Sequence, residues 1–441
     1  METVSYTHLD VYKRQVNAYE LEAMQQQLEA GGYEIVPFED RADVYIINTC
    51  TVTNIADRKS RQMLHRARKC NPDAVVVAAG CYVQAAEEDL KKDKTVDIVI
   101  GNNQKGKLLE LLDEYMDGKG GGEAVLDIGH ASSYESMRIT RTSEHTRAFI
   151  KIQDGCNQFC SYCIIPYARG RIRSREAEDV LEEVAGLAAG GLKEAVLTGI
   201  HLSSYGADRQ EENGLLELVM RLQEVEGIER IRLGSLEPRI ITEEFVRSLS
   251  GLSKFCPHFH LSLQSGCNET LKRMNRHYTT GEYYEKCCLI RESFDHPAIT
   301  TDVIAGFPGE TEEEFEETLA FVKKVQFYEM HVFKYSRRKG TLAAKMEEQV
   351  PEQKKQERSR RLIDLAHDMS QDFRRYYIGR ETQVLLEEPV TAAGERFLAG
   401  YNKEYVRCAF RAGTENTLIS GTPAALTEDG LLLCENAAAC S

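Results

Sequence analysis

The chain has no run of apolar residues that approaches the roughly 18 needed for a helix to cross a membrane. We also expect no secretory signal peptide at its start. It contains no Gly-x4-Gly-Lys phosphate loop, so nothing in it indicates nucleotide hydrolysis. No pair of carboxylates stands out as an acid–base site. These absences argue against a membrane protein, a secreted protein and a nucleoside triphosphatase.

Basic residues are scarce as well. The chain has 55 Lys and Arg against 70 Asp and Glu, which gives a net charge of −15 and a pI near 5.4. An acidic protein of this kind is not expected to bind nucleic acid nonspecifically over its whole surface. Any RNA contact must therefore be local. Its thirteen cysteines are an odd number scattered over 441 residues, unlike a secreted disulfide scaffold. We therefore predict a reducing, cytoplasmic location and two or three domains.

Three of the cysteines lie close together in one short loop. Cys156, Cys160 and Cys163 have Cys-x3-Cys-x2-Cys spacing. Three thiolates can bind three irons of a cubane cluster and leave the fourth iron open, whereas a closed metal site normally takes four protein ligands. The alternatives are a zinc knuckle completed by a distant Cys or His, and three unrelated buried cysteines.

This loop resembles that of the radical SAM superfamily. The resemblance implies a 4Fe-4S cluster bound by Cys156, Cys160 and Cys163, with S-adenosylmethionine (SAM) chelated at the open iron. It further implies a reducing electron donor, because an electron from the cluster cleaves the sulfonium bond and produces a 5′-deoxyadenosyl radical.

Before this loop, short apolar runs alternate with amphipathic or basic helical patterns. The predicted strands are 43–47, 74–79 and 96–100, and the predicted helices are 17–31, 55–70 and 105–115. Such alternation predicts a doubly wound parallel sheet over residues 1–117, followed by a Gly-rich flexible linker at 118–140. Cys50 and Cys81 each follow a predicted strand directly, although chance burial of two cysteines remains an alternative.

The surroundings of these two cysteines, together with the radical SAM loop, resemble the methylthiotransferase family. The matching segments are Asn48-Thr49-Cys50-Thr51-Val52-Thr53 and Ala79-Gly80-Cys81. In that family three cysteines of the N-terminal domain bind a second 4Fe-4S cluster that holds the sulfur to be inserted. The resemblance assigns Cys50 and Cys81 to the second and third of these.

The first cysteine of that family pattern is missing. The pattern Gly-Cys-Lys-Val-Asn-x-Tyr-Glu aligns with Val16-Asn17-Ala18-Tyr19-Glu20, which places the cysteine at position 14, where this chain has Arg14. Arginine is a permanent cation with no lone pair for iron. Residues 4–15 resemble translated adapter sequence, so we hypothesise that residues 1–15 are an artefact that replaced the true first strand and its cysteine.

Strand and helix patterns also alternate from about residue 148 to 335, and each strand exits into polar or Gly-rich residues. This predicts a partial (β/α)6 radical SAM barrel over residues 141–372, with its active face at the carboxyl ends of the strands. By resemblance, the residues near SAM are Ser235, Gln264, Asp302 and Gly306. Ordinary turns and helix caps are the alternative explanation for these four.

RNA contacts are predicted at two places. Arg169, Arg171 and Arg173 alternate after the cluster loop, so on an extended backbone they project to one side and could pair with phosphates. A solvated surface is the alternative. Residues 375–441 predict short strands with Gly-rich connections, as in a small antiparallel barrel. They resemble the RNA-binding TRAM domain, which assigns Lys403 to RNA.

Taken together, the resemblance implies a transferase that replaces C2–H of a modified tRNA adenosine with a methylthio group. Residues 51–53 and 161–170 are most similar to the MtaB branch, which acts on N6-threonylcarbamoyladenosine 3′ to the anticodon. The alternatives are the MiaB branch, which acts on isopentenyladenosine, and the RimO branch, which modifies a ribosomal protein. A catalytically impaired tRNA-binding homologue also stays open because of Arg14. We expect a monomer with tRNA as its partner.

Overall fold

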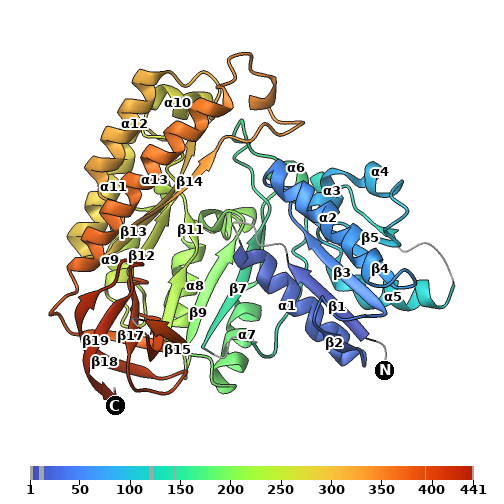
Figure 1. Ribbon diagram of the computed structural model, residues 1–441, viewed down its shortest axis with the longest axis horizontal. Helices are drawn as coiled ribbons and strands as arrows, with labels where there is room; N and C mark the ends of the chain where they lie inside the picture. Colours follow the sequence, from blue (N-terminus) through green and yellow to red (C-terminus); the bar gives the residue numbers. More distant parts are fainter. Residues whose placement is uncertain (1–2, 9–13, 119–122, 143–145, 393, 440–441) are drawn as a thin grey trace.

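The computed structural model describes residues 3–8, 14–118, 123–142, 146–392 and 394–439. Figure 1 shows an N-terminal α/β part beside a larger α/β part, with a small C-terminal β-barrel packed against one end of the larger part.

The N-terminal part is built on a six-stranded parallel sheet of order β2-β1-β3-β4-β5-β6. Its strands are β1 (Thr3–His8), β2 (Glu34–Val36), β3 (Val44–Thr49), β4 (Val75–Gly80), β5 (Ile98–Ile100) and β6 (Glu123–Ala124). Its helices are α1 (Arg14–Ala30), α2 (Asn54–Cys70), α3 (Cys81–Ala85), α4 (Glu87–Leu90) and α5 (Leu108–Met116).

Alternate residues of the central strands serve two separate cores. Val44 and Ile46 of β3 pack with α1 and α5 on one face. Tyr45 and Ile47 pack with α2 on the other. Because both faces are covered, β3 and β4 are buried at every position, which explains why they read as continuous apolar runs. The predicted doubly wound sheet is therefore present.

Two segments of this part are more ordered than their sequence alone indicates. Residues 3–8 show no strand alternation, yet they form β1 between β2 and β3, where both edges find backbone partners. The segment 118–140 is not a free linker over its described part: β6 pairs with β5, and Met137 and Ile139 are buried in the shared core. Residues 1–2, 9–13 and 119–122 lie outside the described residues.

The larger part contains two four-stranded sheets, β10-β9-β7-β8 and β11-β12-β13-β14, parallel except for β8. The strands are β7 (Arg147–Asp154), β8 (Arg173–Ser174), β9 (Glu194–Gly199), β10 (Arg230–Leu233), β11 (Ser235–Leu236), β12 (His258–Leu261), β13 (Ala298–Ala305) and β14 (Glu329–Lys334). The helices are α6 (Ile165–Arg169), α7 (Ala177–Ala189), α8 (Gly214–Leu222), α9 (Glu243–Ser250), α10 (Asn268–Arg273), α11 (Thr280–Ser293), α12 (Glu312–Val325) and α13 (Glu352–Arg375).

The C-terminal part is a closed five-stranded barrel of order β15-β16-β17-β19-β18. Its strands are β15 (Thr382–Ala392), β16 (Glu395–Tyr401), β17 (Arg407–Phe410), β18 (Leu418–Leu426) and β19 (Leu432–Ala439). All neighbours are antiparallel except β17 and β19, which pair in parallel. Closure leaves no free sheet edge.

Buried charges attach this barrel to the larger part. Arg230 Nη1 donates to the Tyr401 carbonyl at 2.6 Å, and Arg232 Nη1 donates to the Lys403 carbonyl at 2.8 Å. Glu194, fully buried, pairs with Arg232 at 2.8 Å and with Arg147 at 3.3 Å. Burial alone would raise the pKa of Glu194, but Arg232 and Arg147 lower it to about 2.

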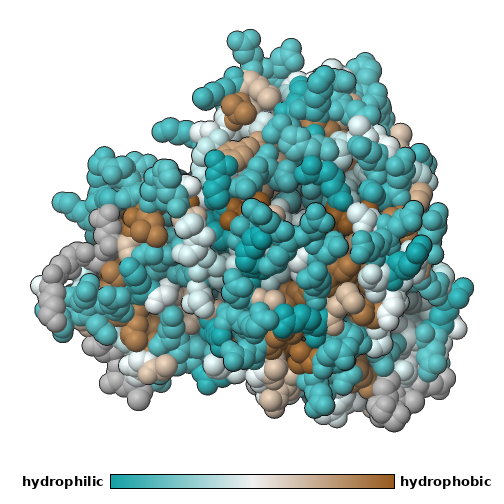
Figure 2. Space-filling view, turned by 180° about the vertical axis from the view of Figure 1, so that it is seen from behind, coloured by the Kyte–Doolittle hydropathy of each residue, from teal (hydrophilic) through white to brown (hydrophobic). Residues whose placement is uncertain are grey.

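In the described part of the chain, no helix combines the length and apolar character required to cross a membrane. Figure 2 shows the face behind that of Figure 1 covered mainly by hydrophilic residues, with hydrophobic residues in small separate groups.

Candidate functional site

The loop that carries Cys156, Cys160 and Cys163 begins where β7 ends at Asp154. Gly155 has a φ of +73°, and a Cβ there would lie 1.8 Å from the Arg171 carbonyl oxygen. Only glycine fits such a position. The backbone N–H of Cys156 donates to the Gly170 carbonyl at 3.0 Å, so the start and the end of the loop are joined.

A neighbouring segment after α10 supports the middle of the loop. The Ser161 N–H donates to the Met274 carbonyl at 3.0 Å, and Asn275 Nδ2 donates to the Phe159 carbonyl at 3.1 Å. Arg276 Nη1 donates to Cys160 Sγ at 3.4 Å. These three contacts fix the middle of the loop, including the sulfur of Cys160, against the segment 274–276.

The loop fits three ligands of an iron–sulfur cubane. Cys160 is buried, Cys156 and Cys163 are half-buried, and a cationic donor lies beside one sulfur. Across the described residues, no group of three or more His, Cys, Asp or Glu side chains converges as the ligands of one metal ion do. Each cysteine of a cubane ligates a different iron, so three thiols of one loop can occupy three irons and leave the fourth open.

The residues predicted near SAM lie on β11 and β13 or just after β12 and β13. The Gln264 N–H donates to the Asp302 carbonyl at 2.8 Å, and Gln264 adopts a φ of +69°, uncommon for a residue other than glycine. Gly306 follows β13 with a φ of +73°, and a Cβ there would lie 2.4 Å from Lys355 Cγ. Gln264 and Asp302 are thus in direct contact. Position 306 requires glycine, because its φ is positive and Lys355 leaves no room for a Cβ.

Two histidines beside these residues were not predicted. His260 is the cross-strand neighbour of Ser235, and its Nε2 lies 3.4 Å from Asp302 Oδ1. His331 is paired in register with Asp302, and its ring centroid is 5.8 Å from that of His260. Burial lowers the pKa of His331 to about 4. Single histidines in short strands carry no local signal, although His258 and His260 do mark alternate positions of one strand.

Cys50 and Cys81 lie at the carboxyl edge of the N-terminal sheet. Cys50 follows β3 and Cys81 follows β4, which are adjacent strands. Both thiols are buried; burial, with the nearby Cys81 contributing less, raises the pKa of Cys50 to about 11. The order β2-β1-β3 reverses between β1 and β3, and ligands of doubly wound sheets bind outside such a reversal.

Position 14 belongs to the same edge by its place in the chain. Arg14 is the first residue of α1, the helix that follows β1. One turn later, the Asn17 carbonyl accepts from Asn48 Nδ2 at 3.4 Å, and Asn17 Oδ1 accepts from Arg169 Nη2 at 3.1 Å. Position 14 thus begins the helix whose next turn contacts Asn48 of β3 and Arg169 of the larger part.

A buried charge network joins the two cysteine sites. Arg169 donates from Nε to Cys81 Sγ at 3.1 Å and from Nη1 to Glu20 Oε1 at 2.7 Å, and it lies 3.2 Å from Asp154 Oδ2. Lys105 and Lys151 also pair with Glu20. Burial would raise the pKa of Glu20, but these three cations hold it well below its usual value.

This network corrects the predicted row of RNA-binding arginines. Arg169 and Arg173 have exposed fractions of 1% and 0%, whereas Arg171 is exposed. Alternation to one side requires an extended backbone, but α6 is helical up to Arg169, and Gly170 then turns with a φ of +72°. Arg171 is left to face solvent, with its guanidinium 4.8 Å from the ring centroid of Phe159.

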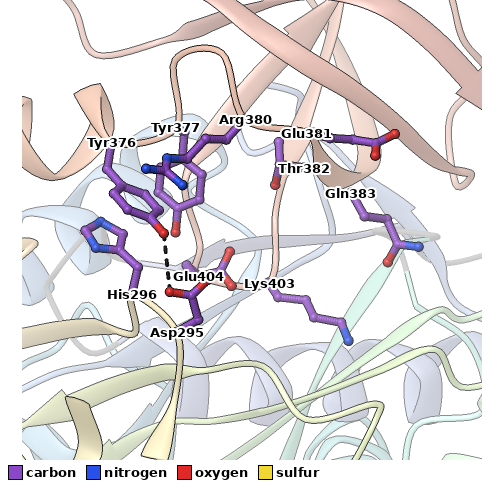
Figure 3. A pocket seen from close by; sticks show the side chains of 10 residues that line it. All are labelled: Asp295, His296, Tyr376, Tyr377, Arg380, Glu381, Thr382, Gln383, Lys403 and Glu404. Carbon is purple, nitrogen blue, oxygen red and sulfur yellow. Dashed lines mark hydrogen bonds between the residues drawn. The ribbon is translucent and has the colours of Figure 1, made fainter. Parts of the chain in front are cut away.

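Lys403 lies far from the cluster loop. Its Nζ donates to the Ser253 carbonyl at 2.5 Å, and it lines a cavity of about 520 Å³ near the C-terminal barrel. Figure 3 shows Tyr376 beside His296, with its hydroxyl donating to Asp295, on one side of that cavity and Gln383 and Lys403 on the other. Asp295 and His296 precede β13, so the cavity is at the amino ends of the strands, away from the cysteine loop at their carboxyl ends.

Comparison with known families gives two matches. The model of the Radical SAM superfamily matches residues 150–322, and that of Uncharacterized protein family UPF0004 matches residues 8–101. The second range includes Cys50 and Cys81, and the first includes the cysteine loop.

Several characterised proteins are similar over most of the chain. Threonylcarbamoyladenosine tRNA methylthiotransferase MtaB of Bacillus subtilis (strain 168) is 42% identical over 420 residues, covering 95% of this chain and 92% of that protein. MtaB of Aquifex aeolicus (strain VF5) is 42% identical, with coverages of 87% and 93%. tRNA-2-methylthio-N(6)-dimethylallyladenosine synthase of Thermoanaerobacter sp. (strain X514) is 38% identical, with coverages of 87% and 82%.

Among solved structures, the radical S-adenosylmethionine methyltransferase TsrM from Kitasatospora setae, with cobalamin and a [4Fe-4S] cluster bound, is similar in fold. The TM-score is 0.57 at 17% identity, and the match covers 89% of this chain and 78% of that one.

Proposed function

The chain belongs to the MtaB family of radical SAM tRNA methylthiotransferases, and we propose that it inserts a methylthio group at C2 of N6-threonylcarbamoyladenosine beside the anticodon of tRNA. It is a radical SAM transferase that uses 4Fe-4S chemistry and SAM. Its partners in the proposal are tRNA and a reducing electron donor, and its proposed place of action is the cytoplasm.

We assign the radical SAM cluster to Cys156, Cys160 and Cys163, and SAM to Ser235, Gln264, Asp302 and Gly306. When bound there, cluster and SAM supply the radical that removes hydrogen from the substrate. Arg276 orients the Cys160 sulfur through its hydrogen bond. Phe307 packs edge-on against both Tyr162 of the loop and Tyr335, and these rings exclude water from beside the loop.

The finer architecture is part of the proposal. Only Gly234 separates β10, which pairs with β9, from β11, which pairs with β12. If β10 and β11 are one interrupted strand, the two sheets form a partial (β/α)6 barrel within residues 141–372. We assign residues 1–117 to the sulfur-carrying domain and the C-terminal barrel, residues 375–441, to a TRAM-like module. Arg171 and Lys403 remain the proposed RNA contacts from the sequence.

One observation supports sulfur insertion over other radical SAM reactions. Arg169 lies six residues after Cys163 and donates to Cys81 beside the N-terminal sheet. The two cysteine sites therefore lie on one buried charge network, as expected for a reaction in which one site makes the substrate radical and the other supplies the sulfur.

The second cluster does not have its full set of ligands in this chain. The family uses three cysteines, and here Cys50 and Cys81 are present while position 14 is Arg14. We therefore derive no step through that cluster. A clean genomic read of the 5′ end of the gene decides whether residues 1–15 belong to the protein; a read that encodes Arg14 rejects the artefact hypothesis.

Mass spectrometry of tRNA nucleosides tests the function. A strain that lacks its own enzyme is complemented with the gene as written and with Arg14→Cys. The proposal expects the 2-methylthio group on threonylcarbamoyladenosine with the Arg14→Cys gene. Restoration on the isopentenyl nucleoside alone favours the MiaB-like alternative.

Arg14 itself supports a second candidate, a tRNA-binding homologue that has lost catalysis. Formation of 5′-deoxyadenosine from SAM by the reduced protein separates the two candidates. Absence of this product favours the binding protein.

A further inference from the structure

Helix α2 carries a concentration of positive charge in an acidic chain. It contains six Lys or Arg and one acidic residue, Asp57, whereas the whole chain has a net charge of −15. Its buried face, formed by Ala56, Ser60, Leu64 and Ala67, packs on the sheet. The basic side chains are therefore on the opposite face.

That face is open to solvent and only partly neutralised. Its exposed cations are Arg58, Lys59, Arg61, Arg66 and Lys69. Arg66 pairs with Glu39 at 3.4 Å. Within the part of the chain that the structure describes, no acidic side chain forms an ion pair with Arg58, Lys59 or Lys69. Like charges on neighbouring turns of a helix repel each other. Binding of an anion relieves this repulsion and is therefore favourable.

The spacing suits an extended polyanion better than a single anion. A hollow of about 410 Å³ along the helix is lined by Arg58, Arg61, Gln62, His65, Arg66 and Lys69. From position 58 to position 69 a helix rises by roughly 16 Å. Several phosphates of one strand fit along that length.

The start of α2 is fixed beside the reaction site. Arg338, which follows β14 at its carboxyl end, donates to Asp57 Oδ2 at 2.7 Å and to Thr51 Oγ1 at 2.6 Å. Asn54 Nδ2 donates to the Arg337 carbonyl at 2.9 Å. Cys50 lies just before this helix. Figure 1 shows α2 running from this junction across the N-terminal sheet.

We propose that the exposed face of α2, formed by Arg58, Lys59, Arg61, Arg66 and Lys69, binds the phosphodiester backbone of the tRNA whose anticodon loop enters the site. The identity of the RNA rests on the proposed function. These contacts position the RNA and do not read its sequence. A local cationic face is what an acidic protein needs to hold a polyanion, because its mean field repels one.

The salt dependence of tRNA binding tests this surface. The full-length, iron-loaded protein is compared with Arg58→Gln/Lys59→Gln/Lys69→Gln, which removes three exposed cations that have no acidic partner among the described residues. The control is Arg247→Gln/Lys323→Gln/Arg360→Gln, which makes the same charge change at exposed positions on α9, α12 and α13. The probe is tRNA that carries N6-threonylcarbamoyladenosine, titrated at several KCl concentrations. Melting curves and iron content check that each variant is folded.

The α2 variant is expected to lose about tenfold or more in affinity at low salt. The slope of log K against log[KCl] should become shallower by roughly 2 to 3, because each phosphate contact contributes about 0.7 to 0.9. The control variant should match the wild type. An α2 variant whose slope equals that of the control overturns the proposal; this is the result expected if the face binds an acidic protein instead.

The test of the α2 surface can fail or succeed independently of the test of the proposed function. Wild-type protein that methylthiolates tRNA while the α2 variant keeps its salt slope refutes only the surface. Salt-dependent binding through α2 without any methylthio product refutes only the function. If the triple variant fails to fold, Arg58→Gln and Lys69→Gln are measured singly, each with an expected slope change of about one contact.

Discussion

Arg169 Nε donates a hydrogen bond to Cys81 Sγ over 3.1 Å. Arg169 ends α6, six residues after Cys163, and Cys81 begins α3, directly after β4 of the N-terminal sheet. The same guanidinium contacts Glu20 and Asp154 and is almost fully buried. One side chain thus joins the edges of the two sheets at which the two cysteine sites lie.

Removal of this guanidinium should destabilise the protein strongly. Arg169→Gln leaves Glu20 and Asp154 with less compensating charge in the interior, at an expected cost of about 3–5 kcal/mol in the free energy of unfolding. Arg171→Gln is the control, because Arg171 is exposed. It should change the free energy of unfolding by less than about 0.5 kcal/mol. Denaturant unfolding of both variants measures the difference. Equal effects of the two substitutions would contradict the buried network.

A methyl group at Gly155 should abolish the cluster. A Cβ at this position collides with the Arg171 carbonyl, and the loop must move to accept Gly155→Ala. Gly186→Ala, within α7, is the control, since a Cβ there meets nothing within 4 Å. Iron per chain after anaerobic reconstitution should fall sharply in Gly155→Ala and stay unchanged in Gly186→Ala. Full iron loading of Gly155→Ala would show that the loop tolerates the side chain.

Glu194 should make stability depend on pH. Its pKa is depressed to about 2 by Arg232 and Arg147 despite burial, so its contribution is fully present above its unfolded pKa and is lost as pH falls through about 2. That contribution is on the order of 3 kcal/mol. Glu194→Gln should therefore be much less stable than wild type at pH 7, and the gap should narrow between about pH 4.5 and pH 2.

The control for this prediction is the exposed Glu217→Gln, which should follow the wild type across the same pH range. Unfolding free energies at a series of pH values provide the comparison. A gap between Glu194→Gln and wild type that stays constant down to pH 2 would contradict the assignment.

Local patterns predicted the parts of the structure that local sequence controls. The strands predicted at 43–47 and 74–79 overlap β3 and β4, because strands buried on both faces read as apolar runs. The loop with Cys156, Cys160 and Cys163 was readable because its thiols are close in sequence. By contrast, β1 has mixed polarity, and its assignment depends on backbone pairing with β2 and β3.

The arginines after the loop show why long-range contacts escape such reading. Arg169 was predicted to face RNA, but its partner Glu20 is 149 positions away in the chain. No spacing rule connects two such residues. His260 and His331 were missed for the same reason, since only the strand order brings them beside Asp302.

Our central proposal is that this chain has an intact radical SAM site and a second cluster site that lacks one ligand. Iron and sulfide per chain, after anaerobic reconstitution, test it most directly. The account predicts about four irons for the chain as written and about eight for Arg14→Cys, one and two cubanes respectively. About eight irons in the chain as written, or no gain with Arg14→Cys, would contradict it.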